Sequence, residues 1–193
     1  GYDYNIVWFE VGNPTNNGTL SNVMGAVTID FPSPGTYQVE IDGLFPRIYF
    51  NAASFLSDKD SRKLLTIEQW GDIAWTSMES AFSGCKNLRI NAIDAPDLSG
   101  VISMSRMFYE AEVMNDNINH WVVNNVEDMS GLFRDATDYN QPLDTWEVTK
   151  VTNMSEMFYF ARAFNQAINF NPGNGNNGGD AWNTSNVTNM ASM

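Results

Sequence analysis

The chain has 193 residues, and its 43% hydrophobic content is enough for a packed core and argues against disorder. Ten basic and 23 acidic residues leave a formal charge of −13, and because a phosphate-binding surface needs the opposite sign, nucleic acid is a poor candidate partner. No stretch approaches about 18 consecutive apolar residues, so we expect no transmembrane segment in this piece, and the single cysteine excludes a disulfide framework or a multi-cysteine zinc site.

The first fifty residues have the alternating pattern of short antiparallel strands. Apolar and other residues alternate over 2–8 and again over 37–41, and Val27 and Ile29 indicate a further strand between them. Residues 13–18 are rich in Asn, Pro and Gly, which predicts a loop. Together these patterns predict three strands of a β-sandwich.

Residues 31–41, F-P-S-P-G-T-Y-Q-V-E-I, resemble the Tyr-x-x-x-Gly-x-Tyr-x-Val ending of PKD-type domains. The resemblance implies that residues 1–50 form a partial PKD-like domain whose early strands would lie before Gly1. It does not extend upstream, where the family's Trp-Gly-Asp-Gly turn is replaced by other residues at 8–13. We expect a strand over 44–50 and a solvated, charged connector over 51–63.

From about Leu64 the chain repeats one phrase. It reads V-T-N-M-S-E-M-F at 151–158, recurs at 126–133 and 101–108, and has a looser copy at 75–82. A last copy opens at Val187, and the chain ends one residue before its expected Phe, which predicts that the sequence is a piece of a longer protein. The first Met of successive copies lies 26, 25, 25 and 36 residues after the previous one, at Met78, Met104, Met129, Met154 and Met190. A period near 25 residues predicts a solenoid over residues 64–193.

Each copy carries large apolar side chains in the same register, which predicts a continuous buried ladder. The ladder residues are Trp70, Trp121, Trp146 and Trp182; Met104, Met129 and Met154; Phe82, Phe108, Phe133 and Phe158; and Cys85, Ala111, Ala136 and Ala161. Pro96 takes the Trp place in one copy.

The spacing within a copy predicts local structure. Val151, Met154, Phe158 and Ala161 fall at i, i+3, i+7 and i+10, which predicts a short helix with one apolar face, and residues 164–168 alternate as in a short strand. The predicted fold class is therefore α+β, a PKD-like segment followed by a leucine-rich-repeat-like solenoid with a helix and a strand in each coil. One recurring polar position is expected to hydrogen-bond the turn backbone of the neighbouring coil; its residues are Asn115, Asn140 and Asn165.

The pattern V-T-N-M-S-x-M-F-x-x-A-x-x-F-N-Q-x-I-x-x-W resembles the BspA-like leucine-rich-repeat surface proteins, the Met-Phe-Asn-Trp repeat family of bacterial lipoproteins and adhesins. The resemblance covers about two thirds of the chain. It implies a secreted or surface-exposed bacterial protein, outer membrane-associated, that contacts proteins or glycans or forms part of a larger envelope assembly. It implies no catalytic residues, and we expect a non-enzymatic interaction or adhesion protein that needs no cofactor.

Three residues directly after the motif Phe are less apolar than their neighbours: Tyr109, Arg134 and Tyr159. We interpret these three residues as an exposed row that contacts a ligand. Residues 169–180 are an Asn- and Gly-rich insertion between repeats, which we interpret as a tolerated surface loop rather than a functional one.

The histidine, the cysteine and several aspartates of the repeats each have a simpler interpretation than a reactive or metal-binding role. His120 stands where the next coil has Thr, so a turn substitution is favoured over a catalytic base. Cys85 stands at an Ala position, which favours a structural role over a nucleophile. Six carboxylates could supply a calcium site, but no D-x-D-x-D-G loop is present, so a solvated acidic face is favoured; they are Asp94, Asp97, Asp128, Asp135, Asp138 and Asp144.

Two further functions stay open at this stage. The recurring tryptophans could form a sugar-stacking platform, so a carbohydrate-binding module is the alternative function. A carboxylate pair on a concave face could act on glycosides. Burial of Trp121 and Trp146 would count against the first, and two close acidic groups in a cleft would favour the second.

Overall fold

The computed structural model describes residues 1–50, 60–176 and 178–193, and these form two compact units, Gly1–Pro46 and Arg47–Met193. Most of the predicted connector lies outside the described residues. Its described end includes the 3-10 helix η1, Ser61–Lys63. Each unit is considered by itself.

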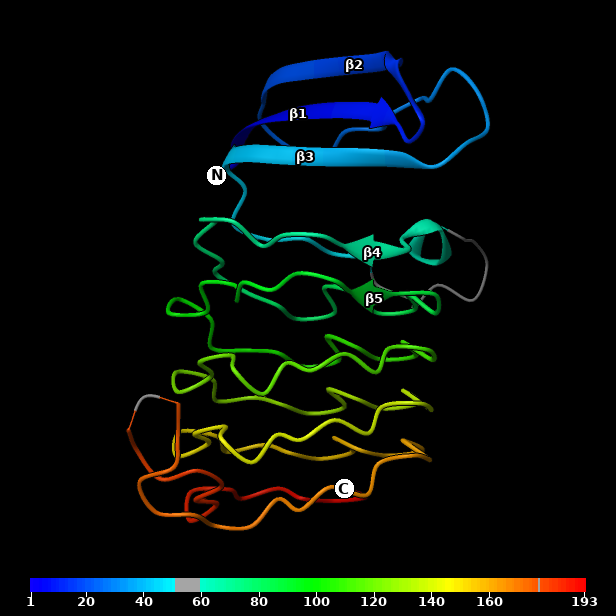
Figure 1. Cartoon of the computed structure of the whole chain (residues 1–193). Coiled ribbons are helices and arrows are strands. Elements are labelled where there is room, and N and C mark those ends of the chain that lie inside the picture. The colour runs from blue at the N-terminus through cyan, green and yellow to red at the C-terminus, as the bar shows by residue number, and fades with distance from the viewer. Residues whose placement is uncertain (51–59, 177) are drawn as a thin grey trace. The chain divides into compact units, whose positions relative to one another are not determined.

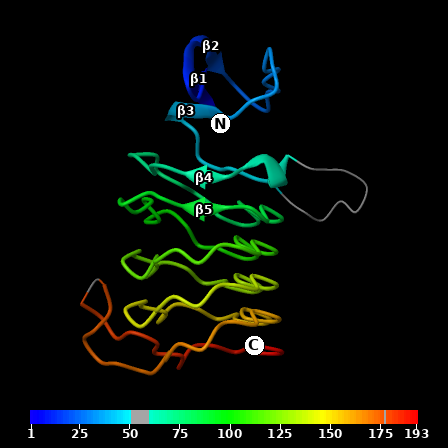
Figure 2. The same cartoon turned by 45° about the vertical axis from the view of Figure 1, so that its right-hand side comes forward.

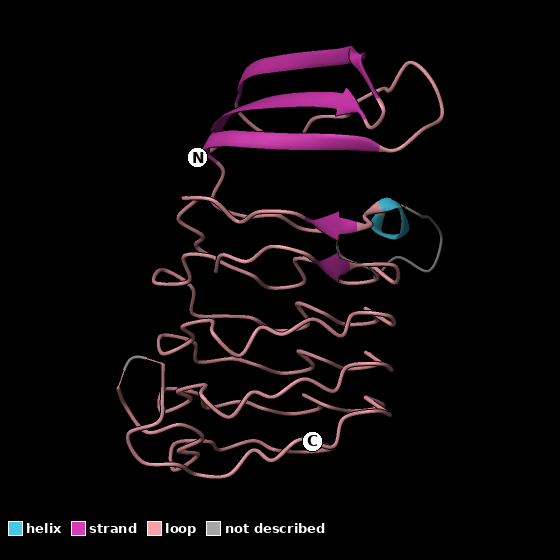
Figure 3. Ribbon diagram, in the orientation of Figure 1, coloured by secondary structure: helices cyan, strands magenta, loops and turns pink. Residues whose placement is uncertain are grey.

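The first unit is one antiparallel sheet. Strand β1 (Asp3–Glu10) lies between β2 (Asn13–Val23) and β3 (Tyr37–Leu44) (Figure 3). Ile6 of β1 pairs with Leu20 on one side and Ile41 on the other, so three apolar side chains meet on one face. Aromatic side chains extend this face in two clusters, one formed by Tyr2, Tyr4 and Phe45 and one by Trp8, Phe31 and Tyr37.

Several predictions for this unit are wrong. Residues 13–18, predicted as a loop, begin β2, which is an edge strand and therefore tolerates Pro14. Gly18 is needed there because a Cβ at this position would lie 2.5 Å from the Trp8 ring. Val27 and Ile29 lie in no strand, and the separate strand predicted over 44–50 does not form, since Leu44 is the last residue of β3 and residues 45–50 lie in no strand. The described residues of this unit form a single three-stranded sheet, not the predicted sandwich.

In the second unit, successive copies of the repeated phrase lie side by side, as both views show (Figures 1 and 2). The short strands β4 (Thr66–Ile67) and β5 (Arg89–Ile90) pair in parallel. Further along, single parallel bridges join the residues just before the motif Met, namely Ser103, Asp128, Asn153 and Asn189. We call this arrangement, residues 64–193, the repeat stack.

Each copy is a run of tight turns whose backbone amides alternate between two kinds of acceptor. In the copy that begins at Met129, the amides of Leu132, Arg134 and Ala136 donate to carbonyls three residues back, at 3.0–3.2 Å. Four other amides of the run donate to backbone carbonyls of the next copy at 2.8–2.9 Å. The donor and acceptor pairs are Met129 to Asn153, Gly131 to Ser155, Phe133 to Met157 and Asp135 to Tyr159. Half of the amides in the run therefore hold neighbouring copies together.

The predicted α+β class, a leucine-rich-repeat-like solenoid with a helix and a strand in each coil, is therefore wrong. Among the described residues the one helix is the three-residue η1, and residues 164–168 form no strand. An α-helix needs negative φ throughout and donates its amides within itself. Here the chain enters the left-handed region every fourth residue, at Arg106 (φ 55°) and Glu110 (φ 56°) in one copy. The apolar spacing that predicted a helix face is met equally by this run of turns.

The repeated apolar residues fill one interior. The Phe82, Phe108, Phe133 and Phe158 rings stack with centroids 5.9, 5.8 and 5.6 Å apart. Met104, Met129, Met154, Trp121 and Trp146 are fully buried, as are Cys85, Ala111 and Ala136, while Ala161 and Trp182 are nearly so. Burial of these apolar side chains stabilises the repeat stack, although its backbone has almost no regular secondary structure.

The tryptophan ladder has one irregularity. The Trp146 indole N–H donates to the Ile118 carbonyl at 3.2 Å, and Trp182 donates to Leu143 at 2.6 Å. Because Pro96 leaves the intervening place without a ring, Trp70 and Trp121 meet edge to face across it, at 5.2 Å. The ring contact thus continues across the copy that lacks a tryptophan.

Candidate interaction strip

Tyr109, Arg134 and Tyr159 lie in one row across three adjacent copies. Each follows a motif Phe, and the stacked Phe rings bring the following residues into the same register. The Arg134 guanidinium carbon lies 5.7 Å from the centre of the Tyr109 ring and 5.0 Å from that of Tyr159. Both distances are within the range of cation–π attraction. All three side chains are partly exposed.

Carboxylates surround the two cations of this region. Arg134 pairs through Nη1 with Glu156 and through Nε with Asp135, the latter at 3.4 Å. Lys86, one copy before Tyr109, pairs with Glu112 and with Glu110, the latter at 3.3 Å. We use the term contact strip for this connected set: Lys86, Tyr109, Glu110, Glu112, Arg134, Asp135, Glu156 and Tyr159.

The charge states of the contact strip follow from these contacts. The hydrogen bond with Glu112 raises the pKa of Lys86, burial opposes this, and Glu110 adds to the rise. Burial, followed by the hydrogen bond and the charge of Glu110, raises the pKa of Tyr109. Lys86 therefore stays charged and Tyr109 stays neutral at physiological pH.

The backbone beneath the contact strip is held between copies. The Glu110 amide donates to the Arg134 carbonyl at 2.9 Å, and the Asp135 amide donates to the Tyr159 carbonyl at 2.8 Å. Both donors have positive φ, 56° and 58°, which costs a non-glycine residue roughly 1–2 kcal/mol. The inter-copy hydrogen bonds offset this cost and hold the backbones of adjacent copies together beneath the row.

The sequence pattern indicated the central row but missed its charged neighbours. Glu110 directly follows Tyr109, and Asp135 directly follows Arg134, so the register could have suggested both. The pairing of Lys86 with two glutamates 24 and 26 residues later could not be read from the pattern, because those side chains occupy different register positions.

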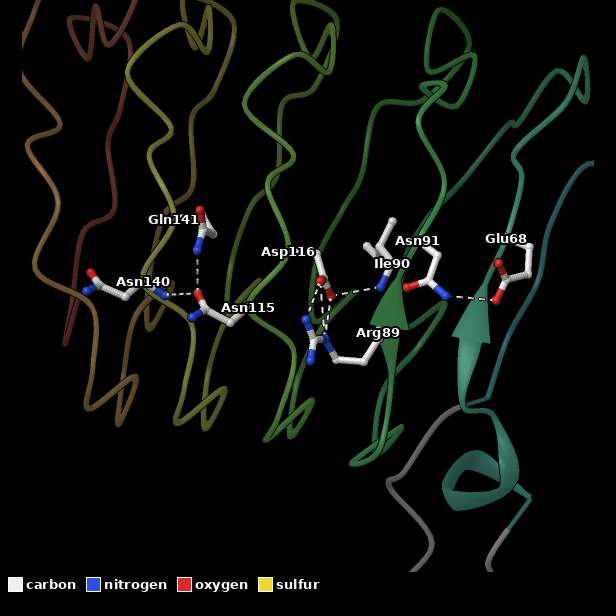
Figure 4. Close-up of polar contacts among 8 residues, drawn as sticks. All are labelled: Glu68, Arg89, Ile90, Asn91, Asn115, Asp116, Asn140 and Gln141. Atoms are coloured by element: carbon white, nitrogen blue, oxygen red, sulfur yellow. Dashed lines mark hydrogen bonds and ion pairs between the residues drawn. The ribbon is translucent and has the colours of Figure 1, made fainter.

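A second row of polar contacts also joins adjacent copies (Figure 4). The Asn91 side chain donates to Glu68 at 3.0 Å, and Asp116 accepts from the Ile90 amide at 2.8 Å and from Arg89. In later copies the Asn140 amide donates to Asn115 Oδ1, and the Asn165 amide to Asn140 Oδ1, each at 2.9 Å. The predicted bonding of the repeated asparagines to neighbouring backbone is confirmed. These contacts are directed at other copies, so we assign the row a structural role.

The carboxylates considered for calcium do not gather in one place. Asp94 accepts from the Trp70 and Gly71 amides, Asp128 accepts from the Ser130 amide, and Asp144 accepts from Asn119. Within residues 1–50, 60–176 and 178–193, no group of three or more His, Cys, Asp or Glu side chains is placed to hold a metal ion.

The other candidate reactive groups are placed as follows. The exposed His120 ring lies 3.4 Å from the Asp94 carbonyl. Cys85 is fully buried, and burial raises the pKa of its thiol to about 12. The thiolate needed for nucleophilic attack is therefore suppressed at neutral pH.

The register tryptophans cannot form an exposed sugar platform. Trp121 and Trp146 have no exposed surface, and Trp70 and Trp182 are 4% and 3% exposed. A sugar would have to stack on an accessible ring face, so a carbohydrate site would have to use other residues. Within the contact strip Glu110 and Glu112 both pair with Lys86, whose single positive charge offsets one of their two negative charges.

The insertion at 169–180 folds back on earlier copies. Asn171 bridges Ala181, so the loop closes on itself. The Asn176 side chain donates to the Asn119 and Trp121 carbonyls at 2.6 and 2.9 Å. Its described residues thus contact the repeat stack through backbone carbonyls.

The fold and the contact strip define a repeat protein whose copies stack side by side and present an aromatic and charged row. A family model described as Mycoplasma protein of unknown function, DUF285, matches residues 76–193. Since this is more than half of the chain and includes the whole contact strip, the protein belongs to that family. No curated protein and no solved structure gives a match. No helix in the described part of the chain is long and apolar enough to cross a membrane.

Proposed function

We propose that the protein is a non-enzymatic interaction protein of the bacterial cell surface or a secreted one, which uses the repeat stack to present the contact strip to another protein. The similarity of its repeats to the BspA-like surface proteins supports the location and the role.

The observation that carries the proposal is the pre-ordered row of Tyr109, Arg134 and Tyr159. Tyr and Arg are enriched among the residues that contribute most to protein–protein binding. Binding usually loses free energy when mobile side chains become fixed, at roughly 0.5–1.5 kcal/mol for each. Arg134 is already held between two rings and two carboxylates, so less of this cost remains.

Site-specific photo-crosslinking tests the role of the row. A photoreactive phenylalanine analogue is placed at Tyr159 in the full chain, and in a matched control at the exposed Phe170. After irradiation of intact cells, we expect a discrete crosslinked protein from position 159 and none from position 170. Equal crosslinking at both positions, or none at 159, would reject the contact strip as the binding surface.

The proposed location is tested separately. Protease added to intact cells should degrade the protein while a cytosolic marker stays whole. Survival of the protein in intact cells, together with its loss after lysis, would contradict a surface location. If the protein is instead secreted, it should appear in the culture medium.

A further inference from the structure

The cations of the contact strip are less accessible than the carboxylates that pair with them. The Lys86 side chain is 27% exposed, against 42% for Glu112. The Arg134 side chain is 29% exposed, against 40% for Glu156. The other two carboxylates, Glu110 at 30% and Asp135 at 33%, exceed their cations only slightly. The carboxylate side chains are therefore somewhat more open to a partner than those of the cations.

The net charge of the contact strip is also negative. The contact strip holds four carboxylates and two cations, so its net charge is −2. The repeat stack as a whole, residues 64–193, has sixteen acidic and six basic residues. Its long-range field repels anionic partners and favours encounter with cationic ones.

The tyrosines add a second feature suited to cations. Arg134 shows that the Tyr109 and Tyr159 rings accept a guanidinium group at cation–π distance. Lysine and arginine also carry long aliphatic stems that can pack on aromatic rings while the charged end reaches a carboxylate. Partly exposed rings beside partly exposed carboxylates match both parts of such side chains.

We propose that the partner of the contact strip is a basic polypeptide segment, whose Lys or Arg cations contact Glu110, Glu112 and Glu156 and whose aliphatic stems pack on Tyr109 and Tyr159. This inference rests on the proposed function and specifies its partner. Sulfated glycans, nucleic acids and neutral sugars lack this chemistry.

The test uses fluorescently labelled octalysine and the whole 193-residue chain, with binding followed by fluorescence anisotropy at low salt. The double variant Glu110→Gln/Glu156→Gln removes two charges from the contact strip while leaving Lys86 paired with Glu112 and Arg134 paired with Asp135. The matched control, Asp72→Asn/Glu127→Gln, removes two exposed charges outside it. We expect the first variant to weaken binding about tenfold and the control less than about twofold.

A second variant, Tyr109→Ala/Tyr159→Ala, keeps the net charge and should also weaken octalysine binding several-fold, while labelled octaglutamate should not bind the wild-type chain. Unchanged circular dichroism and melting would show that the variants fold. Equal weakening in the two charge variants, or no effect of removing the rings, would overturn the proposal. If photo-crosslinking at Tyr159 still succeeds in that case, the binding surface stands and only the basic partner is rejected.

Discussion

The two units of this protein obtain their structure in opposite ways. The first has three regular strands, but among its described residues only Tyr4 and Ile6 are buried hydrophobic side chains. The repeat stack has almost no regular secondary structure, yet it holds all the other buried hydrophobic residues that the structure describes. Regular backbone structure and a well-filled core are therefore separate properties, and the stability of the repeat stack depends on the second.

The largest expected effect comes from removing a ring at the centre of the stack. Phe133 is fully buried between Phe108 and Phe158. Phe133→Ala should lower the free energy of unfolding by about 3–5 kcal/mol, because it removes buried apolar surface and leaves a cavity. Urea unfolding followed by tryptophan fluorescence measures this, since five of the six tryptophans lie in the second unit.

The matched change in the first unit is Val39→Ala, at a position 41% exposed. It should cost less than about 1 kcal/mol, measured by far-ultraviolet circular dichroism. Similar losses for the two variants would contradict the difference in core between the units.

A glycine substitution tests the left-handed turns. Gly131 has a φ of +61°, and a Cβ there would lie 3.2 Å from Arg106 Cγ, a tight contact that requires a small shift of the Arg106 side chain in addition to the backbone strain. Gly131→Ala should cost roughly 1–2 kcal/mol. Gly25→Ala in the first unit, where φ is not in the left-handed region and no atom lies within 4 Å, should be neutral or slightly stabilising. Thermal melts of the two variants provide the measurement.

The asparagine row should matter less than the aromatic ladder. Asn140→Ala removes the acceptor of the Asn165 amide and of the Gln166 side chain. We expect a loss of about 1 kcal/mol in chemical unfolding. The control Gln38→Ala removes an exposed side-chain contact with Glu40 in the first unit and should change stability by less than about 0.5 kcal/mol. A neutral Asn140→Ala would show that the row does not stabilise the stack.

The effect that is smallest at neutral pH is a pH dependence from Cys85. Its thiol pKa is raised from 9.0 to about 12 by burial, so the folded state binds this proton more tightly than the unfolded state. The contribution to stability is complete below pH 9 and is lost as pH rises from about 9 towards 12. The Cys85→Ala variant should lose stability less steeply over this range, as measured by urea midpoints. Identical slopes would contradict the assigned cause.

The positions that point inward could be predicted from the sequence. Trp146, Met129 and Phe133 recur in register with apolar residues of other copies, and such recurrence arises when copies share one interior. The side-by-side contact of Tyr109, Arg134 and Tyr159 is a consequence of the same register. The strands of the first unit were harder to predict, because the turn-favouring residues of 13–18 are tolerated in an edge strand.

The sequence by itself determined the repeat, its register and the residues that fill the interior, because the period and the apolar pattern are properties of one chain read in order. Only the tertiary structure decided the backbone conformation. Gly131 and Phe133 donate their amides to another copy rather than within a helix, and such bonds exist only once the copies are stacked. The same holds for the pairing of Lys86 with Glu110 and Glu112, which depends on how far each side chain reaches across the stack.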